Sequence, residues 1–246
     1  MYHIGIDIGS TYTKYCIVDC DKRILDTYCE RTPIRQKEYF EKKRLFLSNE
    51  YPDARVISCG YGKKNVMAVR NVSELTALAY GSYYMVPEQN IVLDIGGQDT
   101  KIIVHENGKL KEFFVNEKCA AGCGMFLANV LSLLKMRFSD IDLSEVDRPE
   151  ISLSSVCAVF AQSEIIELLA VDCPPKTILQ AVVWQILTQA KMLLSKVKCE
   201  QIVLSGGLTQ IFGISSYAEQ ALGCRVIVPA QAPYLSALGC AIMQLE

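Results

Sequence analysis

Residues 4–24 read IGIDIGSTYTKYCIVDCDKRI, and residues 91–111 read IVLDIGGQDTKIIVHENGKLK. Aligned at an offset of 87 residues (94 minus 7), the two stretches share Asp7 with Asp94, Gly9 with Gly96, Thr13 with Thr100 and Lys14 with Lys101. Each copy places a glycine turn and then a polar turn between apolar segments, which is the pattern of three strands joined by tight turns. This internal repeat predicts two similar halves.

The rest of the chain alternates strands with helices. We expect strands near residues 3–9, 13–18, 24–30, 55–59, 91–95, 100–105 and 110–116, and also in QIVLSGG (201–207) and RVIVP (225–229). We expect helices near residues 35–50, 73–84, from 122, from 155, and over 176–197, 212–221 and 234–244. This alternation predicts an α/β fold with a mixed sheet in each half, divided near Pro87.

Composition argues against several classes of protein. The 246 residues carry a net charge of −2 with no basic excess, so we expect no nucleic-acid partner. The first residues, MYHIGIDIGS, lack the charged and apolar regions of a signal peptide, and no apolar run approaches the length of a membrane span. We therefore expect a cytoplasmic protein that has no membrane contact.

Eleven cysteines are many for this length, but their spacing is irregular and no CxxC pair occurs. A disulfide framework is not expected in a reducing compartment, and a zinc ribbon needs paired CxxC motifs. We interpret most of the thiols as small core residues, as in the apolar runs around Cys16, Cys59 and Cys240. A metal cluster that uses only a few of the cysteines stays open.

Three glycine turns follow apolar strands, and these are DIGST (7–11), DIGGQD (94–99) and LSGG (204–207). Glycine lets the backbone approach a phosphate and point N–H groups at it, while hydroxyl and ammonium groups add donors. One such turn is usually a plain hairpin, but three of them with an internal repeat predict nucleotide binding. The expected nucleotide-binding residues are Asp7, Gly9, Ser10, Thr11, Lys14, Asp94, Gly96, Gly97, Gly206 and Gly207.

Asp7 and Asp94 form a pair of carboxylates if a pseudo-twofold axis relates the two halves. Carboxylate oxygens suit Mg²⁺, usually through bound water, because this ion gives up its water ligands reluctantly. The sequence therefore predicts that these two aspartates hold Mg²⁺ through water.

The motifs DIGSTYTK (7–14), DIGGQD (94–99) and LSGGL (204–208) resemble the two phosphate motifs and the adenosine motif of the actin, Hsp70 and sugar-kinase ATPase superfamily. The resemblance covers nearly the whole chain. It implies two RNase-H-like domains with ATP in the cleft between them, and a last helix that returns to the first domain. The expected domains are residues 1–88 with 234–246, and residues 89–233.

Within that superfamily, DIGGQDTK (94–101), NEKCAAGCGMF (116–126) and SSVCAVFAQSEI (154–165) resemble the activators of 2-hydroxyacyl-CoA dehydratases and the related ATPase subunits of benzoyl-CoA reductase. The resemblance implies a homodimer with one shared [4Fe–4S] cluster, held by Cys119 and Cys157 of each subunit. Such a cluster needs four thiolates, and a twofold axis turns two ligands into four. Both cysteines lie at or before predicted helix starts, where free N–H groups stabilise an anionic cluster.

Cys123, Glu164 and segment 35–47 each have two or more interpretations. Cys123 stands where the relatives would carry a small hydroxyl or similar residue, and we interpret it as an inert replacement rather than an alternative ligand or a site of oxidative damage. Glu164 lies about two helical turns after Cys157, so it either links cluster and nucleotide or is a solvated charge. The basic segment 35–47 is interpreted as an amphipathic helix rather than a docking surface for an acidic electron donor.

The activity implied by the resemblance is an ATP-driven electron gate. A ferredoxin or flavodoxin would reduce the cluster, and nucleotide turnover with Mg²⁺ would rotate the domains so that one electron passes to the dehydratase. Gln98 and Asp99 would orient the attacking water and the metal around the γ-phosphate.

Other functions stay open on the sequence. A small-molecule kinase of the same fold needs a general base, for which Asp99 is a candidate because no separate GTD-like acid follows the second phosphate motif. A nucleotide-binding regulator would leave the cysteines as packing residues. The partner could also be a benzoyl-CoA reductase or a related reductase instead of a dehydratase.

Overall fold

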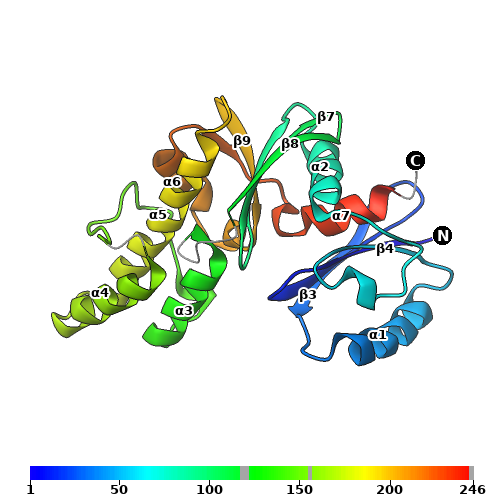
Figure 1. The fold of residues 1–246 in the computed structure, drawn as a ribbon, viewed down its shortest axis with the longest axis horizontal. Coiled ribbons are helices and arrows are strands. Elements are labelled where there is room, and N and C mark those ends of the chain that lie inside the picture. The colour runs from blue at the N-terminus through cyan, green and yellow to red at the C-terminus, as the bar shows by residue number, and fades with distance from the viewer. Residues whose placement is uncertain (117–121, 155–156, 244–246) are drawn as a thin grey trace. The chain divides into compact units, whose positions relative to one another are not determined.

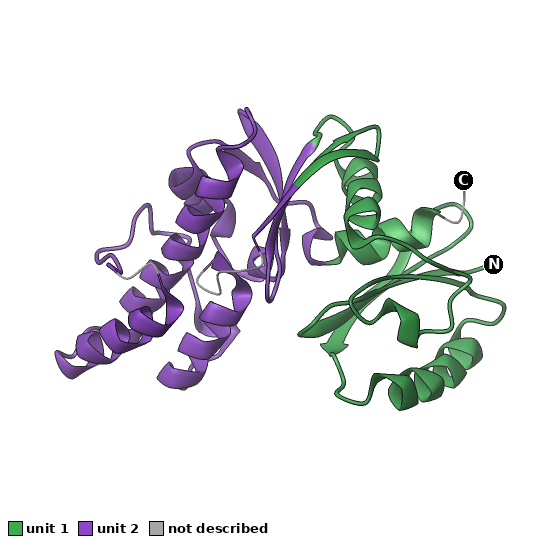
Figure 2. Cartoon of the chain, viewed as in Figure 1, with its two compact units in different colours: residues 1–90, 103–113, 234–246 green, residues 91–102, 114–233 purple. Residues whose placement is uncertain are grey.

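The computed structural model describes residues 1–116, 122–154 and 157–243 (Figure 1). Contacts within the chain divide it into two compact units (Figure 2). Unit 1 comprises residues 1–90, 103–113 and 234–246, and unit 2 comprises residues 91–102 and 114–233.

The first sheet has the strand order β3-β2-β1-β4-β5. Its strands are β1 (His3–Ile8), β2 (Tyr12–Val18), β3 (Ile24–Arg31), β4 (Arg55–Gly60) and β5 (Arg70–Asn71). β1 pairs antiparallel with β2 and parallel with β4, so Asp7 lies opposite Lys14 on one side and opposite Cys59 on the other. Every residue of β1 is buried, which fits its place as the central strand.

The helices of unit 1 are α1 (Gln36–Glu50), α2 (Glu74–Met85) and α7 (Leu235–Ile242). α1 buries Phe40 and Leu47 in the same apolar cluster as the isoleucines of β1. α7 contacts both β1 and α2. A side chain at Gly239 would meet the carbonyl oxygen of Ala77 at 1.8 Å, so only glycine permits this close helix contact. The last helix thus completes the unit that the first strand begins.

The second sheet has the strand order β10-β9-β6-β7-β8. Its strands are β6 (Ile91–Ile95), β7 (Thr100–Glu106), β8 (Lys109–Asn116), β9 (Gln201–Gly206) and β10 (Arg225–Ile227). Read from β8 to β10, this order matches the first sheet strand for strand. β6 pairs parallel with β9 and sets Asp94 opposite Ser205, as β1 and β4 set Asp7 opposite Cys59. The sequence repeat is therefore also a structural repeat.

The helices of unit 2 are α3 (Gly124–Leu134), α4 (Ala158–Ala170), α5 (Pro175–Leu194) and α6 (Ile214–Leu222). α5 is the central helix of this group, because it contacts α3, α4, α6 and β6. The rings of Trp184 on α5 and Tyr217 on α6 meet edge to face at 5.3 Å, and the Tyr217 hydroxyl donates to the Gln180 carbonyl. Short 3-10 helices cover Lys63–Asn65, Phe138–Asp140, Gly207–Gln210 and Ala232–Tyr234.

The α/β fold with two mixed five-stranded sheets and flanking helices confirms the predicted fold class. The helices near the cysteines begin at Gly124 and Ala158, slightly later than the predicted starts near 122 and 155. β5 was not predicted, because two exposed residues carry no alternating pattern. The domain division at 88/89 and 233/234 stays a prediction, while contacts group residues 103–113 with unit 1. No helix in the described part of the chain is long and apolar enough to cross a membrane.

Candidate functional site

The first glycine turn joins β1 to β2. The Gly9 N–H donates to the Tyr12 carbonyl at 3.1 Å and closes the turn. The Thr32 hydroxyl donates to the Gly9 carbonyl at 2.8 Å and lies 3.1 Å from the hydroxyl of Thr13. These bonds fix the backbone of the turn from the far end of β3.

The other predicted ligands of this turn have different environments. Ser10 is exposed, whereas Thr11 and Lys14 are half-buried. The Thr11 hydroxyl oxygen is buried and has no hydrogen-bond partner among the described residues. A buried polar group is normally paired, so this hydroxyl fits a site that a polar ligand completes. Lys14 forms no ion pair within the described part of the chain, so its ammonium is available for an anion.

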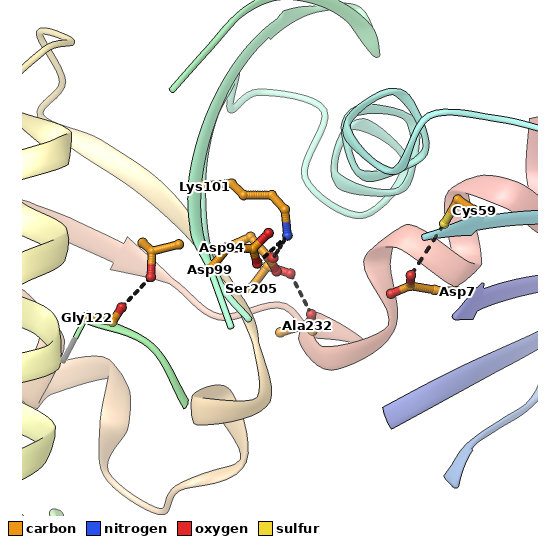
Figure 3. A network of polar contacts seen from close by, with 9 residues as sticks. Asp7, Cys59, Asp94, Asp99, Lys101, Gly122, Ser205 and Ala232 are labelled. Atoms are coloured by element: carbon orange, nitrogen blue, oxygen red, sulfur yellow. Dashed lines mark hydrogen bonds and ion pairs between the residues drawn. The ribbon is translucent and has the colours of Figure 1, made fainter. Parts of the chain in front are cut away.

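Asp7 is buried on β1, and the Cys59 thiol donates to its Oδ1 atom at 3.6 Å (Figure 3). Gly60 follows Cys59 with a φ of 86°, a conformation that favours glycine. A side chain at Gly60 would lie 2.8 Å from Asp7 Oδ1. The end of β4 therefore leaves room for the carboxylate and supplies it with one donor.

The second glycine turn, between β6 and β7, contains a buried charge cluster. Lys101 Nζ lies 2.8 Å from Asp99 Oδ1 and 3.6 Å from Asp94 Oδ2 (Figure 3). Each of the three residues is only 5–6% exposed. Buried charges are stable when they are paired, and two carboxylates with one ammonium leave one net negative charge. The sequence aligned Lys101 with Lys14, but it did not predict that Lys101 pairs with both carboxylates.

The same turn positions Gln98 and Asp99 differently. The Gly96 N–H donates to the Asp99 carbonyl at 2.9 Å, and a side chain at Gly96 would lie 2.7 Å from Asp99 Oδ1. Asp99 is thus held inside the turn, while Gln98 is exposed. The roles predicted for these two residues at the γ-phosphate stay predictions.

The second turn is hydrogen-bonded to the segment that follows the first cysteine motif. At the start of α3, the Gly124 N–H donates to the Gly96 carbonyl at 2.9 Å, and the Met125 N–H donates to the Gly97 carbonyl at 2.8 Å. On β7, the Thr100 hydroxyl donates to the Gly122 carbonyl (Figure 3). The first N–H groups of a helix have no partner inside the helix, so this turn satisfies them. A shift of the turn therefore moves the start of α3.

The third glycine turn follows β9. Gly206 has a φ of 99°, and a side chain there would meet the Ile95 carbonyl oxygen at 2.1 Å. A side chain at Gly207 would meet nothing within 4 Å, so the backbone beside it is open. The Ser205 hydroxyl donates to the Ala232 carbonyl at 2.9 Å (Figure 3). Close packing at one glycine and open space at the next suit a turn that lies against a ligand.

The predicted cluster cysteines differ in what the structure describes. Cys119 lies outside the described residues. Cys157 is an exposed, free cysteine at the N-cap position of α4. Glu164 accepts a hydrogen bond from the Ser154 N–H at 2.8 Å, which ties α4 to the segment before Cys157. Cys123 is only 1% exposed at the N-cap position of α3.

The resemblance implies Mg²⁺ and a [4Fe–4S] cluster, and the described residues fit the first group better than the second. Asp7 and Asp94 are buried carboxylates beside glycine turns, and such oxygens suit Mg²⁺ through water. The exposed Cys157 thiol at a helix N-terminus suits an anionic cluster, but one thiolate cannot hold [4Fe–4S]. Within the described residues, no group of three or more His, Cys, Asp or Glu side chains could hold a metal. The assignment of Cys119 and Cys157 as cluster ligands stays a prediction.

Comparisons with known proteins agree with this geometry. A sequence model of the BadF/BadG/BcrA/BcrD ATPase family matches residues 4–243. The (R)-2-hydroxyglutaryl-CoA dehydratase activating ATPase of Acidaminococcus fermentans is 31% identical, covering 98% of this chain and 96% of its own. An uncharacterised protein of Methanocaldococcus jannaschii is 33% identical, covering 96% of this chain and 98% of its own.

A solved structure is similar over the full length. It is the activator of the 2-hydroxyisocaproyl-CoA dehydratase from Clostridium difficile with bound ADPNP. The TM-score is 0.89 at 28% identity, and the match covers 100% of this chain and 94% of that chain. A solved protein with bound ADPNP therefore has the same architecture as this chain.

Proposed function

The chain belongs to the BadF/BadG/BcrA/BcrD ATPase family, and from that premise we propose that it activates a 2-hydroxyacyl-CoA dehydratase, or a related acyl-CoA reductase, by ATP-driven transfer of one electron. It is an ATPase, and its relatives include enzymes that activate such dehydratases. We propose three features of this activity: the transfer of one electron, the [4Fe–4S] cluster that carries it and the homodimer that holds the cluster. The observation that carries it is the hydrogen-bonded connection between the second glycine turn and the start of α3.

In this proposal the three glycine turns hold ATP. The backbone at Gly9, Gly96 and Gly97 lies close to the phosphates, and Gly206 and Gly207 lie against the nucleoside. The Gly9 and Gly96 N–H groups themselves close their turns by donating to the Tyr12 and Asp99 carbonyls. Around the first turn, the Ser10 and Thr11 hydroxyls and the Lys14 ammonium bind phosphate oxygens. The buried hydroxyl of Thr11, which has no hydrogen-bond partner in the described ranges, supports this assignment.

The two turns also supply the groups for hydrolysis. Asp7 and Asp94 hold Mg²⁺ through water, and this ion, when bound, neutralises charge on the phosphates. Asp99 and the exposed Gln98 orient the attacking water and the metal. Asp99 is already fixed by Lys101, so its carboxylate needs little reorganisation when the nucleotide binds.

The cluster ligands in this proposal are Cys119 and Cys157 from each of two copies of the chain. A [4Fe–4S] cluster, when bound, would accept one electron from a ferredoxin or flavodoxin and pass it to the partner enzyme. The exposed thiol at the start of α4 supports the assignment of Cys157. The burial of Cys123 supports its interpretation as an inert packing residue.

An apolar surface on α4 supports the homodimer. Val159 and Phe160, which directly follow the first residue of the helix, are 72% and 68% exposed, and Ile166 is 51% exposed. Large apolar side chains grouped beside a ligand cysteine favour burial in an interface. A twofold axis beside α4 would bury them against the same residues of the second copy and would bring the thiols together.

The hydrogen bonds from Gly124 and Met125 to the second turn link hydrolysis to the cysteine segment. Loss of the γ-phosphate changes the contacts that the ligand makes with the turn at Gly96 and Gly97. Because α3 begins on those carbonyls, the change reaches the segment after Cys119 through two backbone bonds and one side-chain bond. This is a local route by which nucleotide state alters the electron-carrying site.

Anaerobic purification with assays of iron and acid-labile sulfide tests the proposal. We expect about four irons per dimer in the unmodified chain, because one [4Fe–4S] cluster is shared. Cys119→Ala and Cys157→Ala should each lose the iron, while Cys20→Ala, an exposed cysteine in a polar turn, should keep it. Iron that survives in both ligand variants, or an iron-free protein that still hydrolyses ATP after anaerobic reconstitution, would contradict the electron-transfer role.

A further inference from the structure

The Asp7 carboxylate has an unusual neighbour in the Cys59 thiol. The two residues lie opposite each other in the parallel pairing of β1 with β4, and the thiol donates to Asp7 Oδ1 at 3.6 Å (Figure 3). Asp7 is 3% exposed, and Cys59 is fully buried. The contact is therefore set by strand register and core packing, and the thiol is shielded from solvent.

We propose that Cys59 is a positioning residue of the nucleotide site, whose S–H group fixes the rotation of the Asp7 carboxylate toward bound Mg²⁺ and ATP. This inference rests on the proposed nucleotide role of Asp7. The S–H donor on Oδ1 restrains the carboxylate about its last torsion, which is otherwise broad. Gly60 contributes by leaving the space that a side chain would take from Oδ1.

The Cys59 thiol is the donor in this contact, and it is fully buried. A thiol is a weak donor in water, but a charged acceptor and a low-dielectric interior both strengthen the bond.

The second half of the molecule shows what is particular about Cys59. Ser205 is at the matching position, opposite Asp94 in the pairing of β6 with β9. Its hydroxyl donates to the Ala232 carbonyl, and Asp94 is paired with Lys101. Both halves thus place a small donor at this position, but each one satisfies a different acceptor.

Infrared spectroscopy of the S–H stretch tests the bond without any nucleotide. The Cys59 band is isolated as the difference between Cys240→Ala and the Cys59→Ala/Cys240→Ala double variant, because Cys59 also hydrogen-bonds the Cys240 thiol. We expect Asp7→Asn to shift that band, because a neutral amide oxygen is a weaker acceptor than a carboxylate. The Cys16 band is the control, since Cys16 is equally buried and no hydrogen bond joins it to Asp7 among the described residues. An unchanged Cys59 band in Asp7→Asn would overturn the proposal.

The functional arm is a titration of ATP binding against Mg²⁺ concentration. We expect Cys59→Ala to raise the Mg²⁺ concentration for half-maximal binding about tenfold, the effect of one hydrogen bond to a charged group. Cys59→Ser should restore most of that loss. Cys16→Ala, which removes the same atoms from the same sheet, should change the Mg²⁺ requirement less than about twofold. Equal effects of Cys59→Ala and Cys16→Ala would assign Cys59 to packing.

The two arms separate this inference from the proposed function. An unmodified chain that binds ATP with no Mg²⁺ dependence would remove the metal role of Asp7, whatever the infrared result. A shifted Cys59 band with a normal Mg²⁺ requirement in Cys59→Ala would keep the hydrogen bond but overturn its positioning role. A loss of iron binding leaves both arms unaffected, because neither variant touches Cys119 or Cys157.

Discussion

Asp7 and Asp94 occupy matching positions on the central strands of the two sheets, but their carboxylates contact different side chains. Asp94 shares the Lys101 ammonium with Asp99, so a positive charge is built into the second turn. Asp7 receives a neutral thiol donor from Cys59, and Lys14, which aligns with Lys101, forms no ion pair within the described residues. The same backbone repeat therefore carries two different charge arrangements.

The glycine turns of the two halves of this duplicated fold differ in how many of their polar groups are paired. The second turn is internally paired and is hydrogen-bonded to α3, so its geometry is fixed before any ligand arrives. Among the residues that the structure describes, the Lys14 ammonium beside the first turn has no ion-pair partner and the Thr11 hydroxyl has no hydrogen-bond partner. The second turn is hydrogen-bonded to the rest of its unit, whereas the first turn has polar groups available for an anion.

The largest expected effect separates the two lysines. Lys101→Met should destabilise the protein by about 3–5 kcal/mol, because it leaves two buried carboxylates without their cation. Lys14→Met should cost about 0.5 kcal/mol or less, since no buried ion pair is broken. Urea unfolding of both variants measures the difference. Similar losses in the two variants would mean that the turns are not distinguished by charge.

An intermediate effect separates the two threonines of the repeat. Thr100→Val should cost about 1–2 kcal/mol, because the Gly122 carbonyl loses its hydroxyl donor. Its particular signature is faster hydrogen exchange at the start of α3, where Gly124 and Met125 donate to the turn. Thr13→Val removes a hydroxyl bonded to Thr32 and should leave exchange in α3 unchanged. Exchange that rises equally in both variants would refute a specific link.

The smallest effect concerns pH. His105 aligns with Val18 in the repeat, it is buried, and burial lowers its pKa. The unfolded chain then binds the proton more readily, so stability is fully present above pH 6.5 and falls as the pH drops below that value. The loss is at most about 1.4 kcal/mol for each pH unit.

The control for that pH effect is His105→Val, which copies the residue of the first half. Acid unfolding curves of the two proteins should diverge below pH 6.5, with the variant showing the flatter dependence. Parallel curves would assign the acid sensitivity to other groups. The test asks whether the second half carries an acid-sensitive position that the first half lacks.

The sequence predicted those parts of the fold and site that depend on local pattern. The repeat around Asp7 and Asp94, the glycine turns and the alternation of strands and helices all appear as residue spacing along the chain. The contact between Asp7 and Cys59 depends on the register of two strands far apart in sequence, which no local pattern encodes. The start of α3 on the Gly96 and Gly97 carbonyls was missed for the same reason.

The site assignments remain less complete than the fold. Lys101 was aligned but not recognised as a partner of Asp94 and Asp99, because burial of all three follows from tertiary packing. Exposure of Cys157 agrees with a ligand role, and Cys119 lies outside the described residues. A helix-start cysteine is a weak signal by itself, since the buried Cys123 occupies a similar place at α3.

The position of α7 has a consequence for biosynthesis. This helix follows the whole of unit 2 in the sequence, but it packs against β1 and against α2, where Gly239 makes a close contact with Ala77. A ribosome therefore releases β1 long before the helix that covers it has been made. Unit 1 can finish folding only after α7 has been made, whereas the whole of unit 2 precedes α7 in the chain. Premature termination before residue 235 would leave an apolar sheet surface uncovered, which gives proteolytic quality control a clear means of recognising truncated chains.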